Sequence, residues 1–319
     1  MGKRIVIPGG TGFLGWALAQ FLRARGDEVV VLTRGPGSRR DDVLWVPWDA
    51  ATLGRWVDHL DGADAIVHLT GKRVDCRPTR RNIAELVSSR VVPVRLVGDA
   101  LERVRRPPPV WVQSSTLAIY GDAGDEVITE ATPVTGIGPP QMVQVALAWE
   151  AAFREASDPV ERAVLLRIGV TFGGPGDPAT ARLGRLVRLG MGGRVAGGTQ
   201  WLSWVALDDV LRGFARAIDD PRVRGLYHLT SPAPVTNDEA MATFRRLLRR
   251  RIGLPSPAWL TRLGAPLLGS DAQLALTGRR AYPARLLDQG FEFRETDFAR
   301  VVRAALAPQL GARGERANQ

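Results

Sequence analysis

A cluster of glycines between an apolar run and a helical pattern restricts the fold of this chain most. Residues 3–7 read as a buried strand, and a helical pattern extends over residues 12–25. The turn between them is Gly9-Gly10-Thr11-Gly12-Phe13-Leu14-Gly15. Glycine permits the positive φ of a tight turn and a close approach of the backbone to a phosphate, and the helix N-terminus offers N–H groups to an anion. We interpret the loop as a dinucleotide-binding turn, with a plain strand-to-helix turn as the alternative.

Short apolar runs alternate with longer amphipathic segments through the first half of the chain. We predict helices at 80–103 and 141–156, and strands at 28–32, 43–46, 65–69, 110–113 and 163–166. Strands that alternate with helices indicate βαβ units and a parallel sheet. The predicted fold is therefore an α/β, doubly wound, parallel-sheet Rossmann domain.

The pattern changes after the loop at 172–178, where the chain becomes helix-rich with short extended pieces at 226–229 and 291–293. A smaller, mostly helical lobe is expected from this part, and we leave open that some of its segments return to the first domain. The predicted divisions are a Rossmann domain over 1–172, a substrate-binding lobe over 173–310 and a frayed polar tail over 311–319.

The composition argues against several classes of protein. A single cysteine, Cys76, excludes an internal disulfide framework, and with only three histidines we expect no soft-ligand metal site. A carboxylate-bound ion stays open. The N-terminus does not have the pattern of a secretory signal, and no stretch approaches the roughly 18 apolar residues of a membrane helix. We therefore expect a cytoplasmic protein with no membrane partner.

The formal net charge of +10 comes mostly from arginines that are spread along the chain. The densest clusters, at 103–106 and 245–251, fall where we predict helix ends, and arginine is favourable near a helix C-terminus. No nucleic-acid-binding motif accompanies the charge, so we expect no nucleic-acid partner. The positive field is suited to attracting a phosphorylated cofactor.

The residues after the second predicted strand discriminate between two nicotinamide cofactors. Chains that bind NAD usually carry an acidic residue there, which holds the ribose 2′-hydroxyl. This chain has Thr33-Arg34-Gly35 and then Ser38-Arg39-Arg40. Arg34 is suited to pair with a 2′-phosphate, with Arg39 or Arg40 adding charge. The sequence therefore favours NADP(H), and the alternative is that these arginines are solvated loop residues.

Motifs along nearly the whole chain resemble one protein family. Besides residues 9–15 and 32–34, the matching segments are Trp48-Asp49, 63–72, Ser89-Arg90, 114–116 with Tyr120-Gly121, Trp149-Glu150, 166–169, 197–204 with Asp208-Asp209, 234–237 and 290–293. The chain resembles an extended short-chain dehydrogenase/reductase of the NAD(P)-dependent epimerase/dehydratase family. It is most similar to a bacterial epimerase-family group that has a C-terminal domain of unassigned function.

The resemblance implies roles for individual residues. Asp49 touches the adenine edge, residues 69–71 line the cofactor, residues 114–116 lie near the nicotinamide ribose, and residues 167–170 flank the nicotinamide. Substrate lies at the carboxyl ends of the strands, under the second lobe, and the long helices often form a homodimer interface. The predicted cofactor ligands are Gly9, Gly10, Thr11, Gly12, Phe13, Leu14, Thr33, Arg34, Arg39, Asp49, Leu69, Thr70, Gly71, Ser114, Arg167 and Gly169.

One part of the family pattern is missing. The usual catalytic set is a Ser or Thr with a Tyr-x-x-x-Lys helix, in which the phenol exchanges a proton and the ammonium lowers its pKa. Thr116 fits the Ser/Thr position. Counting back from Glu150 puts Met142 at the Tyr position and Ala146 at the Lys position. Neither side chain transfers a proton, which puts the usual route in doubt.

Other residues are candidates for the missing roles. Lys72 follows the cofactor-lining segment and is our second catalytic candidate, with a surface lysine as the alternative. Arg90 is a candidate clamp for a substrate anion, and Cys76 would be a reactive thiol if a neighbouring arginine lowered its pKa. Tyr120 more resembles a structural residue.

A polar and aromatic segment in the second lobe is the candidate substrate site. Gln200, Trp201 and Ser203 have the side chains to stack on a ring and to hydrogen-bond to it. The alternative is that the aromatic residues belong to the core and that Ser203 is a local cap. Asp208, Asp209 and Asn237 read as helix-start residues.

Taken together, the residues predict an NADP(H)-dependent oxidoreductase or epimerase-like enzyme that acts on a small carbonyl or alcohol substrate. Thr116 would hydrogen-bond the substrate oxygen, and Lys72 or water would supply the proton. The alternative is a non-catalytic NADP(H)-binding protein that senses redox state or binds a partner.

Overall fold

The computed structural model describes residues 2–317 and contains an eight-stranded sheet with the order β12-β8-β6-β5-β1-β2-β4-β3. The pairs β1–β2, β1–β5, β2–β4 and β5–β6 are parallel, and the pair β3–β4 is antiparallel. The strands are β1 (Arg4–Pro8), β2 (Glu28–Thr33), β3 (Ser38–Arg40), β4 (Val43–Pro47), β5 (Ala65–His68), β6 (Val110–Thr116), β8 (Arg162–Ile168) and β12 (Gly225–Leu229).

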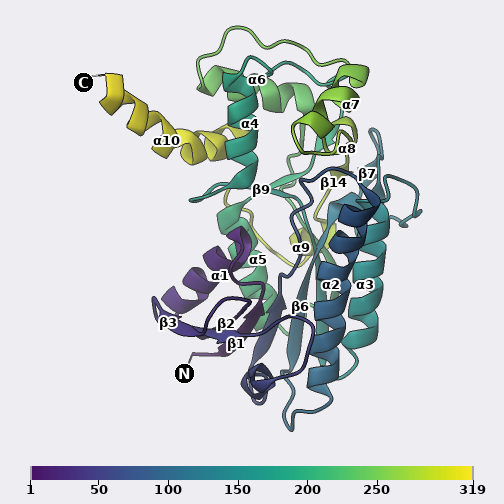
Figure 1. Ribbon diagram of the computed structural model, residues 1–319, viewed down its shortest axis with the longest axis vertical. Coiled ribbons are helices and arrows are strands. Elements are labelled where there is room, and N and C mark those ends of the chain that lie inside the picture. The colour runs from purple at the N-terminus through teal and green to yellow at the C-terminus, as the bar shows by residue number, and fades with distance from the viewer. Residues whose placement is uncertain (1, 318–319) are drawn as a thin grey trace. The chain divides into compact units, whose positions relative to one another are not determined.

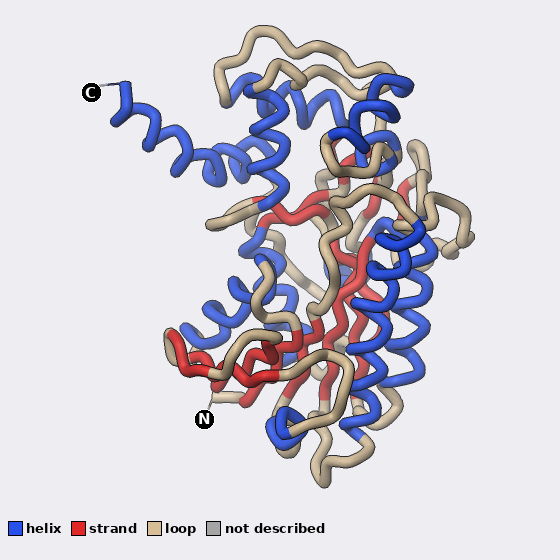
Figure 2. The backbone as a smooth tube through the Cα atoms, viewed as in Figure 1, coloured by secondary structure: helices blue, strands red, loops and turns tan. Residues whose placement is uncertain are grey.

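Helices cover both faces of this sheet (Figure 1). The helices α2 (Arg80–Leu101) and α3 (Val143–Ala156) lie side by side on one face, and α1 (Phe13–Ala24) and α5 (Leu207–Asp219) lie on the other. Figure 2 shows the strands as an inner layer between blue helices. The predicted doubly wound Rossmann fold is confirmed.

The chain reverses its direction of winding between β1 and β5. Strands β2 and β4 follow β1 outward on one side, whereas β5, β6 and β8 extend outward on the other. In open parallel sheets, a crevice forms at the carboxyl ends of the strands at such a switch point. The topology therefore fixes where a ligand can bind before any side chain is considered.

The core of this part is apolar and tightly packed where α2 meets α3. Val97 and Leu101 of α2 and Phe153 of α3 belong to one buried cluster with Trp111 of β6. A Cβ built on Gly98 would lie 2.8 Å from the Cβ of Ala156, so the two helix backbones can approach closely only because residue 98 is glycine. This packing holds α2 against the sheet along the edge of the crevice.

The chain divides into two compact units with boundaries that differ from a single cut at residue 172. Unit 1 comprises 1–119, 134–167 and 211–227, and unit 2 comprises 120–133, 168–210 and 228–319. Residues 211–227 belong to unit 1 because the buried Arg162 guanidinium donates to the carbonyls of Ala217, Ile218 (2.8 Å) and Val223 (3.1 Å). Residues 120–133 belong to unit 2, where β7 (Val127–Ile128) pairs with β14 (Arg280–Ala281).

Unit 2 has a separate aromatic core in which Phe172, Trp204, Phe244 and Phe298 pack together. Its strands are short. Besides β7 and β14, the elements are β9 (Val170–Phe172), α4 (Pro178–Arg188), β10 (Trp201–Leu202), β11 (Trp204–Ala206), β13 (Val235–Thr236), α6 (Asn237–Leu247), α7 (Ala258–Leu267), α8 (Gln273–Leu276), α9 (Ala284–Asp288) and α10 (Phe298–Ala317). The mostly helical lobe is therefore as expected.

One local prediction in this unit is wrong. Residues 291–293 form no strand, because the Phe291 N–H closes the turn after α9 on the Leu286 carbonyl and its ring packs edge-on against Phe293. The helix α10 extends to Ala317 and so includes most of the segment expected to be a polar tail, whose fraying stays a prediction. Residues 318–319 lie outside the described residues.

Within residues 2–317, no helix combines the length and the apolar character that crossing a membrane requires.

Candidate functional site

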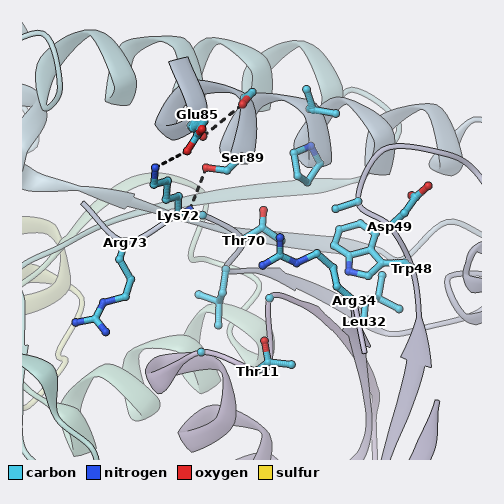
Figure 3. A pocket seen from close by; sticks show the side chains of 18 of the residues that line it. Thr11, Leu32, Arg34, Trp48, Asp49, Thr70, Lys72, Arg73, Glu85 and Ser89 are labelled. Carbon is cyan, nitrogen blue, oxygen red and sulfur yellow. Dashed lines mark hydrogen bonds and ion pairs between the residues drawn. The ribbon is translucent and has the colours of Figure 1, made fainter. Parts of the chain in front are cut away.

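A cavity of about 810 Å³ lies in unit 1 at the carboxyl ends of β1, β2 and β5 (Figure 3). Four segments line it: the glycine loop, the end of β2 with Arg34, residues 48–50 after β4, and residues 69–76 after β5. One face of α2 from Glu85 to Pro93 completes the wall. The cavity therefore occupies the crevice that the sheet topology predicts.

The structure gives a different reason for glycine at each position of the loop. Gly9 has φ +87°, and a Cβ there would lie 2.6 Å from the Leu69 carbonyl carbon. A Cβ on Gly10 would lie 2.6 Å from Val31, and one on Gly15 would lie 2.5 Å from the Gly9 oxygen. Gly12 is different, because its Cβ would meet only the Gly9 oxygen at an ordinary 3.7 Å. No described protein atom demands glycine at position 12, and its missing side chain leaves space in the cavity.

The N-terminus of α1 opens into that space. Gly12 is the N-cap residue, and no side chain among the described residues bonds to the terminus. The first helical bond that closes here is from Trp16 N to the Gly12 oxygen at 2.8 Å. The N–H groups of the first turn and the helix dipole are therefore directed at a cradle that fits a diphosphate.

The end of β2 presents a cation and no acid. Arg34 is exposed, lines the cavity and extends toward its middle in Figure 3. Thr33 is buried, and its hydroxyl accepts a bond from Gly35 N at 3.0 Å, which shapes the turn. Arg39 lies on β3, opposite Leu44 of β4. Of the two arginines predicted to bind a phosphate, Arg34 is the one that lines the cavity.

Asp49 lines the cavity, but its carboxylate is bonded within its own loop. It accepts bonds from the Thr52 hydroxyl (2.6 Å) and from the N–H groups of Ala51 and Thr52 (both 2.8 Å). The Thr52 hydroxyl, followed by the two N–H groups, lowers the pKa of Asp49 to about 2. The predicted contact of Asp49 with the adenine edge would therefore use the atoms of Asp49 that these bonds leave exposed.

Arg90 is buried and bonded to the backbone around the cavity. Its side chain is 8% exposed, and its guanidinium donates to the carbonyls of Leu86 and Lys72, both at 3.0 Å. It also lies 5.0 Å from the centre of the Trp149 ring, and burial lowers its pKa to about 10. These contacts fix the segment after β5 that lines the cavity, and a substrate-binding role of Arg90 stays a prediction.

Lys72 lines the cavity with its ammonium already held. Its Nζ pairs with the Glu85 carboxylate (Figure 3). The same Nζ donates to Asn82 Oδ1 at 2.7 Å. The bonds from Lys72 and Arg81 lower the pKa of Glu85. A proton transfer by Lys72 would first require its release from two acceptors on α2, so the geometry favours an anchoring role. Cys76 lines the same cavity and is partly buried, and its reactivity stays a prediction.

His68 is bonded to both Thr70 and Ser114 at the ends of β5 and β6. His68 is fully buried in β5, and the Thr70 hydroxyl lies 3.3 Å from its Nδ1. The Ser114 hydroxyl donates to the His68 carbonyl at 3.0 Å and so ties β6 to β5. Desolvation lowers the pKa of His68 from 6.5 to about 3, against an opposing hydrogen bond with the backbone of Pro93. The ring is therefore neutral in the folded protein at neutral pH.

We expect this buried ring to make the fold sensitive to acid. Below pH 6.5 the unfolded chain binds a proton on His68, whereas the folded chain does not until about pH 3. The free energy of unfolding should therefore fall as the pH falls from 6.5 to about 3, by about 1.4 kcal/mol per pH unit from this group alone. Urea unfolding of the wild type and of His68→Phe across this range measures the difference.

The matched control for this prediction is His59→Phe, because His59 is only partly buried. It should keep the pH dependence of the wild type, whereas His68→Phe should show a shallower decline. Parallel curves for His68→Phe and the wild type would show that the ring is not buried neutral.

Thr116 and the two residues of the altered helix lie in unit 1. Thr116 ends β6, and its hydroxyl accepts a bond from Ala118 N at 3.1 Å. Met142 is the N-cap residue of α3 and Ala146 lies one turn further on, and both side chains are buried. Within the described residues, these positions of α3 supply apolar packing and no proton donor.

A buried ion pair near the end of β6 was not recognised from the sequence. Glu150 of α3 accepts bonds from Arg167 Nε (2.9 Å), Arg167 Nη2 (2.8 Å) and the Ser115 hydroxyl (2.6 Å). The side chains of Glu150 and Arg167 are 1% and 7% exposed. The Arg167 side chain is thus engaged by Glu150, and a cofactor contact of this residue would use its main chain. The only sequence signal was that both residues belong to the family motifs.

The predicted substrate residues of unit 2 are bonded within that unit. The Gln200 amide donates to the carbonyls of Val195 (3.1 Å) and Ala275 (2.9 Å). Trp201 Nε1 donates to Asp125 at 2.7 Å, and the Ser203 hydroxyl donates to the Arg279 carbonyl at 2.7 Å. These bonds favour the alternative that the segment is structural, because they hold β10 against the chain around residues 275–281.

Structural contacts also involve three further residues of unit 2, namely Tyr120, Gly169 and Asp209. The Tyr120 hydroxyl lies 2.9 Å from Nε2 of the buried His228, in agreement with the expected structural role. Gly169, a predicted cofactor ligand, packs tightly, since a Cβ there would lie 2.8 Å from the Thr230 hydroxyl. Asp209 lies in the first turn of α5 and accepts the N–H groups of Arg294 and Glu295.

The part of the chain that the structure describes contains no group of three or more His, Cys, Asp or Glu side chains suited to hold a metal ion. The sheet order, the glycine loop and the cavity at the switch point together define a Rossmann-type dinucleotide-binding fold.

The chain belongs to the NAD dependent epimerase/dehydratase family, whose model matches residues 5–228. A second model, a domain of unknown function (DUF1731), matches residues 256–305. The predicted family and its C-terminal domain are thus confirmed.

Two curated relatives cover nearly the whole chain. The human epimerase family protein SDR39U1 is 29% identical over 95% of this chain and 100% of its own length. The epimerase family protein MT2273 of Mycobacterium tuberculosis is 30% identical over 93% of this chain and 96% of its own length. A crystal structure of the human SDR39U1 protein with NADPH is similar, with a TM-score of 0.80, 28% identity, and coverage of 95% of this chain and 98% of that one.

Proposed function

We propose that this chain is an NADP(H)-dependent oxidoreductase or epimerase-like enzyme that acts on a small carbonyl or alcohol substrate. The observation that carries the proposal is one cavity with an uncapped helix N-terminus at Gly12 and an exposed cation, Arg34, at the end of β2. These features suit a diphosphate and a 2′-phosphate respectively. The NADPH bound by the human relative supports the choice of cofactor.

The proposed ligands follow from the lining of the cavity. The N–H groups at the start of α1 would hold the diphosphate, Arg34 the 2′-phosphate, and residues 69–71 the inner side of the dinucleotide. Ser114 would act through its bond to the His68 carbonyl, by keeping the ends of β5 and β6 in register. Gly10 and Gly15 would support the loop through packing and without touching the cofactor.

The nicotinamide supplies or accepts the hydride, and the residues of this chain orient the reactants. Thr116 is the proposed hydrogen-bond donor to the substrate oxygen. Its hydroxyl accepts a bond from Ala118 N, which leaves the hydroxyl proton to donate. Since Met142 and Ala146 carry no exchangeable proton, the proton would come from water or from Lys72 after release from Glu85.

We expect Arg34→Ala to weaken NADPH binding by about ten- to a hundredfold, because a hydrogen bond to a charged group contributes about 1.5–3 kcal/mol. NADH binding should change little, since NADH has no 2′-phosphate. Titration of each nucleotide, followed by tryptophan fluorescence, measures both affinities, and Trp48 lines the cavity as a reporter.

Arg39→Ala is the control for this prediction, because Arg39 lies on β3 beside β4. It should keep most of the NADPH affinity. Equal losses for NADPH and NADH in Arg34→Ala would contradict a 2′-phosphate contact, and no binding of either nucleotide to the wild type would remove the proposed function.

A second candidate function is a non-catalytic NADP(H)-binding sensor, possible because Met142 and Ala146 are buried in place of proton-transfer residues. A carbonyl panel assayed under NADPH separates the two functions. Turnover that Thr116→Ala abolishes at unchanged NADPH affinity supports the enzyme. No turnover on the panel together with NADPH-dependent binding of a protein partner supports the sensor.

The homodimer through α2 and α3 stays a prediction that light scattering tests.

A further inference from the structure

The helix α7, labelled in Figure 1, has an apolar stripe whose side chains are exposed to solvent. Trp259, Leu260, Leu263 and Leu267 lie within about 100° of the helix circumference at 3.6 residues per turn. Their exposures are 62%, 44%, 64% and 82%, and no residue of α7 is buried. An amphipathic helix normally turns such a stripe toward a core. Outside this stripe, the Thr261 hydroxyl is bonded to the Ser256 hydroxyl at 2.7 Å.

Exposed arginines precede this stripe in the chain and one lies on the helix itself. Arg249, Arg250 and Arg251 are exposed just before α7, and Arg262 is exposed at the edge of the stripe. The segment 249–270 contains these four arginines and no acidic residue. Two further exposed apolar side chains, Ile252 (74%) and Leu254 (65%), lie next to the arginine run. We call residues 249–268 the α7 surface.

The charge selects among the possible occupants of this surface. A second copy of the chain would bring four arginines against four arginines with no acid in the segment to pair with them. An anionic lipid bilayer pairs its head groups with the arginines and accepts a convex apolar helix face without a shaped groove. Tryptophan and leucine beside arginine are the composition of helices that lie in the membrane interface.

We propose that the α7 surface binds to the surface of an anionic lipid bilayer, with the stripe of α7 in the interface and the arginine run on the head groups. This contact lies in the segment that matches the domain of unknown function, and it is independent of the cofactor site. It requires no membrane-spanning helix. It replaces the expectation from the sequence that the protein has no membrane partner.

The test is flotation of the full chain with vesicles of phosphatidylcholine alone and of phosphatidylcholine mixed with phosphatidylglycerol. The wild type should float with the mixed vesicles and lose this binding as salt is raised. Replacement of Arg249, Arg250 and Arg251 by Gln should lower partitioning to mixed vesicles by roughly ten- to a hundredfold. Leu263→Asp should abolish it, and Trp259→Phe should remove the vesicle-dependent part of the tryptophan emission shift.

Ile137→Asp is the matched control, because Ile137 is an apolar residue that is 77% exposed outside the α7 surface. It should float like the wild type, and thermal unfolding should show that all variants are folded. A wild type that stays unbound with mixed vesicles at low salt overturns the proposal. So does a Leu263→Asp variant that floats normally, or a dimer in light scattering that Leu263→Asp breaks, since the surface would then bind a second copy.

Discussion

Gly9→Ala is expected to destabilise the fold by about 2–5 kcal/mol and to abolish NADPH binding. A residue with a Cβ pays about 1–2 kcal/mol for the left-handed backbone, here φ +87°. The new methyl group would also lie 2.6–2.7 Å from the backbone of Leu69 and Thr70, and such overpacking costs about 1–3 kcal/mol. Because Leu69 and Thr70 line the cavity, the displacement falls on the site that we propose for the cofactor.

Two further glycine variants separate the cost of the backbone conformation from the effect on NADPH binding. Gly26→Ala has a similar φ of +93° and no atom within 4 Å of the new Cβ, so it should show only the backbone cost and bind NADPH normally. Gly12→Ala has no protein clash, so it should unfold like the wild type while its NADPH affinity falls more than about tenfold. Urea unfolding and nucleotide titration measure both quantities. Wild-type affinity in Gly12→Ala would mean that the diphosphate does not lie on the α1 terminus.

Glu150→Gln is expected to cost about 3–5 kcal/mol of stability, because it leaves the Arg167 charge buried without its counter-charge. The Gln side chain has nearly the same shape and can still accept one bond, so the loss is mainly electrostatic. The same change loosens the end of β6, since Glu150 also holds the Ser115 hydroxyl next to Thr116. Chemical unfolding followed by circular dichroism measures the loss.

Helix α3 offers a control for this change. Glu155 pairs with Arg95 at 3.3 Å, and both side chains are more than half exposed at 64% and 60%. Glu155→Gln should therefore change stability by only about 0–1 kcal/mol. A double variant with Glu150→Met and Arg167→Met should be more stable than Glu150→Gln, because no charge then remains buried without a partner. Equal losses for Glu150→Gln and Glu155→Gln would contradict the buried pair.

Local signals in the sequence determined much of the fold. The glycine turn at 9–15, the alternation of strands with helices and the turn residues are local signals, and the structure confirms the Rossmann fold that they predicted. The absence of an acid after β2 is also readable directly, as is the absence of a proton donor at Met142 and Ala146. Absences of a residue type need no knowledge of neighbours in space.

The tertiary structure alone decided which polar side chains remain available for a ligand. The Arg90 guanidinium donates to the Leu86 and Lys72 carbonyls, and the Lys72 ammonium pairs with the Glu85 carboxylate. Ser203 is taken by the Arg279 carbonyl, 76 residues away in the sequence. Such partners come from different elements, and no local pattern specifies them. A charged or polar residue at a family position predicts chemistry only if the fold leaves it unpaired, because a buried polar group is almost always bonded to something.

The same reason explains the exposed stripe of α7 and the division into units. Periodicity can place apolar residues on one face of a helix, but only packing shows whether that face meets a core, and for Trp259, Leu263 and Leu267 it does not. The return of residues 211–227 to unit 1 depends on the Arg162 guanidinium, which lies more than 50 residues earlier in the sequence. The sequence by itself determined the alternation of strands and helices in the first half of the chain and the position of the glycine loop. The long-range contacts decided where the units divide, which cations are used internally, and which surface remains uncovered.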